Sequence, residues 1–165
     1  MTTQTGARQH GLYLDEFHVG DTWDSPRRTI TDADLVLFAG LSGDFNPIHT
    51  DEEFAKGTQF GTRILHGPGT FAIATGLESR LGIKEGTAIA FLGMTWSMRA
   101  PVFIGDTIWV QETVAEVRPS SSKPDRGIVT FDVAIKNQRD EVCQGGQWIV
   151  MVERAQDRQA GATGA

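Results

Sequence analysis

The segment from Leu41 to Asp51, LSGDFNPIHTD, brings together side chains that can carry acid–base chemistry. It holds a carboxylate at Asp44, an amide at Asn46 and an imidazole at His49. An aspartate and a histidine held rigidly on one turn can grip a water molecule between them. One group can then take a proton from the water while the other delivers a proton elsewhere. Asp44 and His49 are therefore a candidate acid–base pair.

Two residues that restrict the backbone interrupt this segment. Gly43 can adopt a conformation that is closed to other residues. Pro47 fixes its own φ and keeps Asn46 out of the helical region. We therefore expect an ordered turn that is not part of a helix.

Each of the polar residues in this segment also has an ordinary structural explanation. Asp44 can bond its own backbone, Asn46 before a proline is a common turn signal, and a lone histidine such as His49 is more often structural than catalytic. Asp44, His49 and Asp51 also carry metal-ligand atoms. Their spacing matches no usual zinc pattern and acid–base chemistry of this kind needs no metal, so no metal site and no cofactor are expected.

Length, charge and cysteine content narrow the classes to which the chain can belong. At 165 residues it suggests one domain that needs no disulfide or structural metal to fold. The formal net charge of −6 argues against nucleic acid as a partner, and no apolar run approaches the length of a membrane span. The single cysteine, Cys143, fits a reducing compartment, and the start MTTQTGARQHG lacks the apolar core of a signal peptide. A cytoplasmic protein is therefore expected.

A helix is expected to lead into the candidate turn. Thr31 suits its N-cap, acidic residues follow in the first turn, and the helix should end between Gly40 and Gly43. Its apolar stripe is formed by Leu35, Val36, Phe38 and Ala39. A short helix is expected over 51–56.

A second motif, His66-Gly67-Pro68-Gly69, precedes a helix expected from Thr70 to about Leu81. Pro68 suits the first position of a helix, because its missing N–H costs nothing there. Small and apolar residues cover most of the circumference of this helix, which indicates that other structure wraps around it.

The remainder of the chain has the pattern of strands joined by short turns. After a short extended arm over 22–30, long strands are expected over 88–99, 107–118, 127–138 and 141–153. The first of the long strands is apolar on both faces and is expected to be central. A sheet that wraps a central helix buries both elements, and its edges favour pairing with a second copy. Residues 1–12 and 155–165 are expected to be flexible, and 13–154 to form a single domain.

Three blocks, LSGDFNPIH, ILHGPGTFA and FLGMTWSMRAPVFIGD, together resemble the MaoC-like dehydratases, which include the (R)-specific enoyl-CoA hydratases. The resemblance covers roughly residues 15–153. It implies an α+β hot-dog fold, a curled antiparallel sheet wrapped around one long central helix. It also implies a homodimer or a higher homo-oligomer.

The resemblance assigns roles to individual residues. Asp44 and His49 match the family's catalytic pair, and Asn46 matches the asparagine that orients the site. Gly67 matches the glycine whose N–H helps to bind the thioester oxygen. The neighbouring residues implied to bind substrate are His66, Pro68 and Gly69. Where the family often has Met-Leu after His-Gly, this chain has Pro68-Gly69, and Ala72 stands where some members have serine.

The implied reaction is reversible hydration of a trans-2-enoyl-CoA thioester to the (R)-3-hydroxyacyl-CoA. The alternatives are a hot-dog acyl-CoA thioesterase, a non-catalytic hot-dog subunit, and a dehydratase acting on acyl-carrier-protein or on branched or carboxylated enoyl-CoA such as mesaconyl-CoA. Side chains that could line an acyl pocket are Met94, Trp96 and Met98. Cations that could meet the CoA phosphates are Arg63, Arg99 and Lys123.

Overall fold

The computed structural model describes residues 11–155, so most of the flexible ends expected over 1–12 and 155–165 lies outside this range. The helices are the 3-10 turn η1 (Leu14–Glu16), α1 (Asp32–Ser42), α2 (Pro47–Thr50), α3 (Glu52–Lys56) and α4 (Gly67–Ser79). The strands are β1 (Thr22–Asp24), β2 (Arg28–Thr29), β3 (Ala88–Met98), β4 (Thr107–Pro119), β5 (Arg126–Asn137) and β6 (Val142–Glu153).

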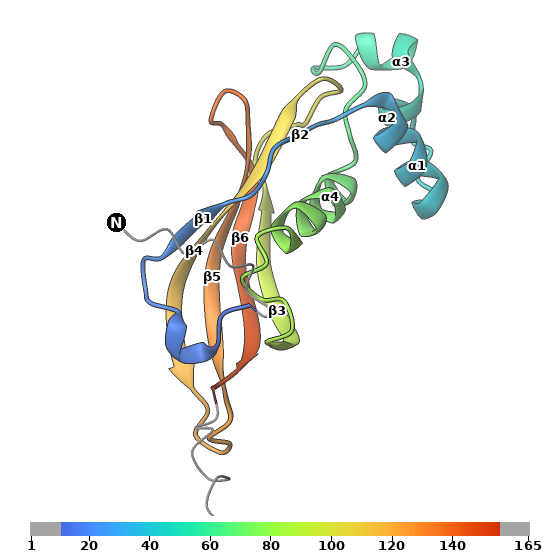
Figure 1. Ribbon diagram of the computed structural model, residues 1–165. Coiled ribbons are helices and arrows are strands. Elements are labelled where there is room, and N and C mark those ends of the chain that lie inside the picture. Colours follow the sequence, from blue (N-terminus) through green and yellow to red (C-terminus); the bar gives the residue numbers. More distant parts are fainter. Residues whose placement is uncertain (1–10, 156–165) are drawn as a thin grey trace, which may run out of the picture.

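The strands form one antiparallel sheet in the order β1-β4-β5-β6-β3, with β2 also pairing with β4. Figure 1 shows the four long strands curving past α4, while α1 to α3 lie together at one end of the molecule. This arrangement confirms the expected hot-dog fold. It brings the helical segment that carries the first motif close to the start of α4, where the second motif lies.

The core lies between α4 and the sheet. Ala74 and Leu77 of α4 are buried, and they face a sheet surface that buries Phe131 and Trp148. Phe71, near the start of α4, packs edge-to-face against Trp96 and Trp148 at centroid distances of 5.1 and 5.8 Å. Burying each such large side chain contributes roughly 1.5–3 kcal/mol, so the helix is held to the sheet chiefly by apolar contact.

The prediction that residues 88–99 form a central strand was wrong. Among the described residues, β3 pairs with β6 alone and forms an edge of the sheet. Its apolar sequence suggested burial on both faces, yet in a single chain many of its side chains are open to solvent. The exposed apolar residues of β3 are Ile89, Phe91, Leu92, Met94 and Met98.

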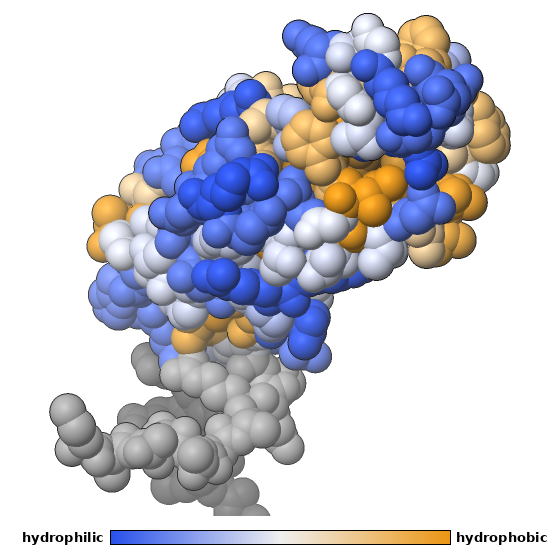
Figure 2. Space-filling model, turned by 90° about the horizontal axis from the view of Figure 1, so that it is seen from above, coloured by the Kyte–Doolittle hydropathy of each residue, from blue (hydrophilic) through white to orange (hydrophobic). Residues whose placement is uncertain are grey.

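Two helices are less covered than their sequences predict. α4 packs against the sheet on one side only, so Ala72, Thr75 and Gly76 are exposed and the expected wrapping is incomplete. In α1, Leu35 and Ala39 are buried, but Val36, predicted in the same stripe, is exposed. Figure 2, which looks down on the molecule from above, shows hydrophobic residues at the surface among polar ones. Within residues 11–155, no helix combines the length and hydrophobicity needed to span a membrane.

Candidate active site

The first motif begins where α1 ends. Gly43 closes α1 in the left-handed conformation, with φ of 75°, and its N–H donates to the Ala39 carbonyl over 2.8 Å. Glycine adopts this conformation without a steric penalty, which allows the chain to turn sharply out of the helix. Asp44 therefore enters the site directly after a rigid element.

Asp44 and Asn46 each hold the backbone of the turn. The Asp44 carboxylate accepts the N–H of Asn46 over 3.2 Å, and the side-chain amide oxygen Oδ1 of Asn46 accepts the N–H of Ile48 over 3.3 Å. Asn46 is thereby the N-cap of α2, and Pro47 occupies its first turn. The prediction of a turn without helix was wrong in this respect, because the cap and the proline together favour one helical turn. His49 lies on that turn.

The imidazole of His49 is held in a defined orientation. Its Nδ1 lies 2.8 Å from the carbonyl oxygen of Ile64. A carbonyl oxygen can only accept, so Nδ1 must carry the hydrogen and donate it. In the neutral ring Nε2 then keeps its lone pair, and His49 is partly exposed. The sequence thus positions a nitrogen that can accept a proton from water.

His66 connects the two motifs. Its ring is almost fully buried, and its Nε2–H donates to the main-chain carbonyl of Asp44 over 2.9 Å. The ring stacks on His49 with a centroid distance of 3.8 Å and an interplanar angle of 26°. On another side it meets Phe38 at 5.0 Å. The Nδ1 atom of His66 is buried and has no hydrogen-bond partner within the described chain.

Asp44, His49 and His66 place one ligand atom each within 4.8 Å of one another. We call these residues the Asp44–His49–His66 cluster. Such spacing suits a bound water molecule, and the same atoms could hold a divalent cation. Asp51, which the sequence grouped with Asp44 and His49, caps α3 instead by accepting the N–H of Phe54 over 3.0 Å.

Gly67 is the first residue of α4 and follows His66 directly. The first N–H groups of a helix have no partner within it and lie at the positive end of its dipole, so this end can stabilise a negative oxygen. A Cβ on Gly67 would lie 2.5 Å from the sulfur of Met98, which packs closely against the glycine. Gly69 likewise packs on the ring of Phe38, where a Cβ would lie 3.0 Å from Cγ.

A cavity of about 280 Å³ opens beside Gly67. Its wall includes Leu65 and Thr70, and the cation Arg99 lies on its lining. Arg63, by contrast, is engaged by carboxylates: its guanidinium lies 2.9 Å from Asp32 and 3.2 Å from Glu52. Of the cations considered for CoA phosphates, Arg99 is therefore the one beside the candidate site, and Lys123 lies in the turn between β4 and β5.

The segment between α3 and α4 is braced through Glu52. Thr62 donates to the Glu52 carboxylate over 2.9 Å, and Arg63 adds a second contact. The hydrogen bond from Thr62 is the main reason that the pKa of Glu52 lies below its usual value. These bonds tie the approach to His66 to α3, and the ion pair of Arg63 with Asp32 ties it to α1.

Sequence reasoning missed Gln144 on β6. Gln144 is 2% exposed, its amide N–H donates to the Gly67 carbonyl over 3.0 Å, and its oxygen accepts the indole N–H of Trp96 over 3.0 Å. No local motif marks a residue 77 positions away from Gly67. A signal was present, because Gln144 shares the inward alternation of β6 with Trp148 and Val150 and is polar where they are apolar.

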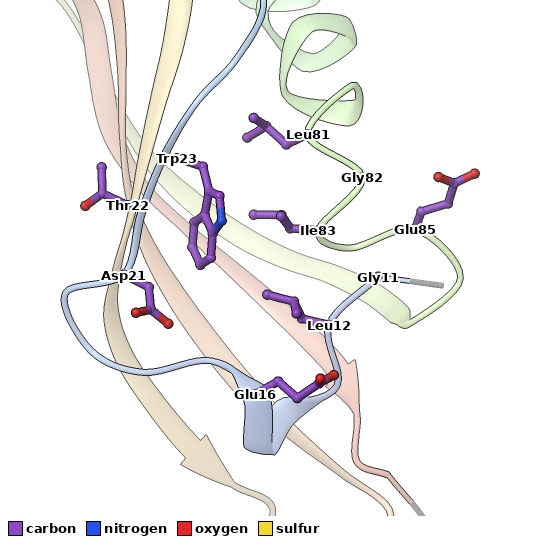
Figure 3. A pocket seen from close by; sticks show the side chains of 10 residues that line it. All are labelled: Gly11, Leu12, Glu16, Asp21, Thr22, Trp23, Leu81, Gly82, Ile83 and Glu85. Carbon is purple, nitrogen blue, oxygen red and sulfur yellow. The ribbon is translucent and has the colours of Figure 1, made fainter. Parts of the chain in front are cut away.

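A separate cavity of about 580 Å³ lies away from the cluster (Figure 3). Leu12, Trp23 and Ile83 give it apolar walls, and carboxylates from Glu16 and Asp21 are nearby. None of the sequence-predicted site residues lines it.

A buried ionic group lies between the end of α4 and the sheet. Lys84 contacts Glu78 at 2.8 Å and also contacts Glu112, and its ammonium sits 4.2 Å from the ring centroid of Phe131. Burial raises the pKa of Glu112 to about 7.

Burial also raises the pKa of the Cys143 thiol to about 11, so this cysteine is poorly suited to act as a nucleophile.

Comparison with known proteins places these features in context. The sequence model of the protein family described as "MaoC like domain" matches residues 16–135 of this chain. The chain is 37% identical over 147 residues to the 3-hydroxybutyryl-CoA dehydratase of Methylorubrum extorquens, covering 88% of this chain and 87% of that protein. It is 36% identical over 120 residues to the (R)-specific enoyl-CoA hydratase of Rhodospirillum rubrum, covering 72% and 77%.

A solved structure of this family is also similar to the chain in fold. The MaoC-like dehydratase from Rhodospirillum rubrum superposes with a TM-score of 0.78 at 36% identity, covering 88% of this chain and 99% of that chain. The structural likeness therefore extends over most of the chain, and the family match over residues 16–135 includes both motifs.

Proposed function

The chain belongs to the family of MaoC-like dehydratases, and on that basis we propose its activity. It hydrates trans-2-enoyl-CoA thioesters reversibly to (R)-3-hydroxyacyl-CoA. The observation that carries the proposal is the meeting of the Asp44–His49–His66 cluster with the first turn of α4. It puts proton-transfer groups next to a helix end that can receive a negative oxygen.

Water is held between the carboxyl group of Asp44 and Nε2 of His49. As the water oxygen attacks C3 of the enoyl group, one of the two residues takes a proton from it. The other residue enters the reaction protonated and supplies the proton that arrives at C2, so that a hydroxyl is added at C3 and a hydrogen at C2. Proton exchange between the pair and solvent then restores the starting state. The bond from His49 Nδ1–H to Ile64 supports this part, because it leaves Nε2 directed to act on the water.

Attack at C3 moves electrons toward the thioester carbonyl, whose oxygen becomes an enolate. The N–H of Gly67 donates to that oxygen, and the dipole of α4 adds to the stabilisation. A donor of this kind is typically worth about 10²–10³ in rate, because it is already oriented when the charge forms.

The other residues of the second motif have more indirect parts in this proposal. His66 and Gly69 are buried, so His66 braces the Asp44 backbone and Gly69 lets Phe38 pack against the helix. Pro68 is exposed beside Gly67 and is the member of the three with surface left to contact the substrate. Arg99 on the cavity wall is placed to meet an anionic group of CoA.

The test is incubation of the full chain with crotonyl-CoA. Loss of enoyl absorbance and formation of (R)-3-hydroxybutyryl-CoA, identified by chiral chromatography, are expected. Release of free CoA thiol with the enoyl absorbance intact would indicate a thioesterase and overturn the proposal. Parallel assays with longer, branched and carboxylated enoyl-CoAs and with enoyl thioesters of acyl-carrier-protein define the substrate range.

We also propose that two copies of the chain associate through β3. Among the described strands, β3 has one open edge, and its apolar side chains are exposed in a single chain. Antiparallel pairing of β3 with its own copy would satisfy the unpaired backbone groups and cover those side chains by a two-fold operation. Light scattering coupled to size exclusion should give twice the chain mass, and Phe91→Lys should favour the monomer.

A further inference from the structure

We propose that Gln144 and Trp96 are positioning residues that hold the oxyanion-binding end of α4 in place, an inference that rests on the hydratase function proposed above. Neither side chain needs to touch the substrate. Their role is to fix where the N–H of Gly67 points when the thioester oxygen becomes an enolate.

Two consecutive hydrogen bonds connect Trp96 on β3 through Gln144 on β6 to Gly67 on α4, and each residue donates to the next. The indole N–H of Trp96 donates to the Gln144 oxygen over 3.0 Å, which fixes the orientation of the amide. The amide N–H of Gln144 then donates to the Gly67 carbonyl over 3.0 Å. Gln144 is 2% exposed, so water does not replace these bonds readily.

Packing supports the same end of the helix. Met98 is directly opposite Gln144 in the β3–β6 pairing, and its side chain lies against Gly67. Trp96 lies two residues earlier on β3, and its ring meets Phe71 of the first turns of α4 at 5.1 Å. Side chains from the adjacent strands β3 and β6 therefore hold the start of α4 in place. The hydrogen bonds from Trp96 to Gln144 and from Gln144 to Gly67 set its position most specifically.

Holding the start of α4 in place has a kinetic consequence. An oxyanion donor works because its position is set before the charge develops, and small displacements weaken it greatly. The Gly67 N–H gains most of its value in the transition state, so misplacing it should lower kcat much more than it changes KM. A residue that only stabilised the fold would lower the melting temperature without this pattern.

The first variant is Gln144→Met, which keeps the length of the side chain and removes both hydrogen bonds. We expect kcat on crotonyl-CoA to fall about 10- to 100-fold, with KM within about twofold of the parent value. The matched control is Gln147→Met on the outward side of the same strand, which is exposed and should keep the parent kcat. Circular dichroism and thermal unfolding identify the temperature range in which both variants are folded.

Trp96→Phe keeps an aromatic ring and removes the N–H donor together with part of the indole ring system. It should lower kcat in the same direction but less than Gln144→Met. Combined with Gln144→Met it should cause a smaller loss than it causes alone, because the hydrogen bond that it removes is already absent. Additive losses in the double variant would argue that the two residues act separately.

Gln144→Glu provides a readout that a purely structural role would not produce. A protonated glutamic acid can accept from Trp96 and donate to the Gly67 carbonyl, whereas the carboxylate can only accept. Its kcat should therefore approach the parent value at low pH and fall through a single ionisation that the parent lacks. The ionisable groups around this position include Arg99 on the cavity wall, His66 before Gly67 and the neighbouring Cys143 on β6, and all three are present in the parent as well.

The outcomes separate this inference from the proposed function. If the parent hydrates crotonyl-CoA but Gln144→Met keeps the parent kcat, or Gln144→Glu has the parent pH profile, the positioning role is wrong and the hydratase function stands. A parent that does not hydrate any enoyl thioester would overturn both. If Gln144→Met does not fold, Trp96→Phe and Gln144→Glu decide the matter by the same criteria.

Discussion

Glu112 should make the stability of the folded protein decrease as pH rises, and Gln at this position should remove the effect. Glu112 is fully buried on β4, with Lys84 in contact and Glu78 nearby. Desolvation by burial is the main reason that its pKa rises to about 7, and the charge of Lys84 opposes that rise in part. Glu112→Gln keeps the shape of the side chain and removes its titration.

The sign follows from the raised pKa. The folded protein holds the Glu112 proton more tightly than the unfolded chain, in which the pKa is 4.5. The resulting stabilisation is fully present below pH 4.5 and is lost as the pH rises through about 7. One pKa unit corresponds to about 1.4 kcal/mol, so the whole effect is on the order of 3 kcal/mol.

The assay is urea unfolding of the parent and Glu112→Gln at about pH 5 and about pH 8. Groups that do not interact with Glu112 titrate equally in both proteins, so the informative quantity is the difference between the free energies of unfolding of the parent and the variant. The stability of the parent relative to the variant should fall by roughly 2–3 kcal/mol between these pH values. The control is Glu116→Gln, an exposed glutamate of the same strand, for which the difference should stay constant. If Glu112→Gln follows the parent in parallel, the burial argument is wrong.

Other predictions concern the site itself. Asn46→Ala removes the cap of α2 and should lower the free energy of unfolding in urea by about 1 kcal/mol. It should also lower kcat, because His49 lies on that helix. Asn46→Ser should restore most of the stability and most of kcat. Arg99→Gln should raise KM for crotonyl-CoA several-fold and leave KM for crotonyl-pantetheine unchanged, whereas an equal change in both would remove Arg99 from CoA binding. EDTA should leave the hydration rate unchanged. Zn²⁺ should inhibit hydration by binding to Asp44, His49 and His66. Zinc inhibition that persists in His66→Ala would contradict that assignment.

The local features of the site were largely readable from the sequence. Gly43, Asn46 and Pro47 have strong backbone preferences, so the turn that presents Asp44 and His49 could be expected from their order alone. The helical turn of α2 was missed because it is only four residues long and depends on its cap. The strands expected over 107–118, 127–138 and 141–153 likewise correspond to β4, β5 and β6 to within one residue at each end.

Long-range pairings were harder to predict. β3 was expected in the centre because its composition is apolar on both faces, but composition does not distinguish a buried strand from an edge that stays apolar. The bonds from His66 to Asp44 and from Gln144 to Gly67 join residues 22 and 77 positions apart, and no spacing rule connects them. The inward polar Gln144 was the one local sign of such a contact.

The central claim is that Asp44 works with His49 on a water molecule beside the start of α4. Comparing Asp44→Asn with Asp51→Asn tests it most directly, because both changes are isosteric and an asparagine can still cap α3 at position 51. Asp44→Asn should lower the rate of crotonyl-CoA hydration by about 10²–10⁴, and Asp51→Asn should keep the parent rate. Hydration by Asp44→Asn at the parent rate would contradict the claim.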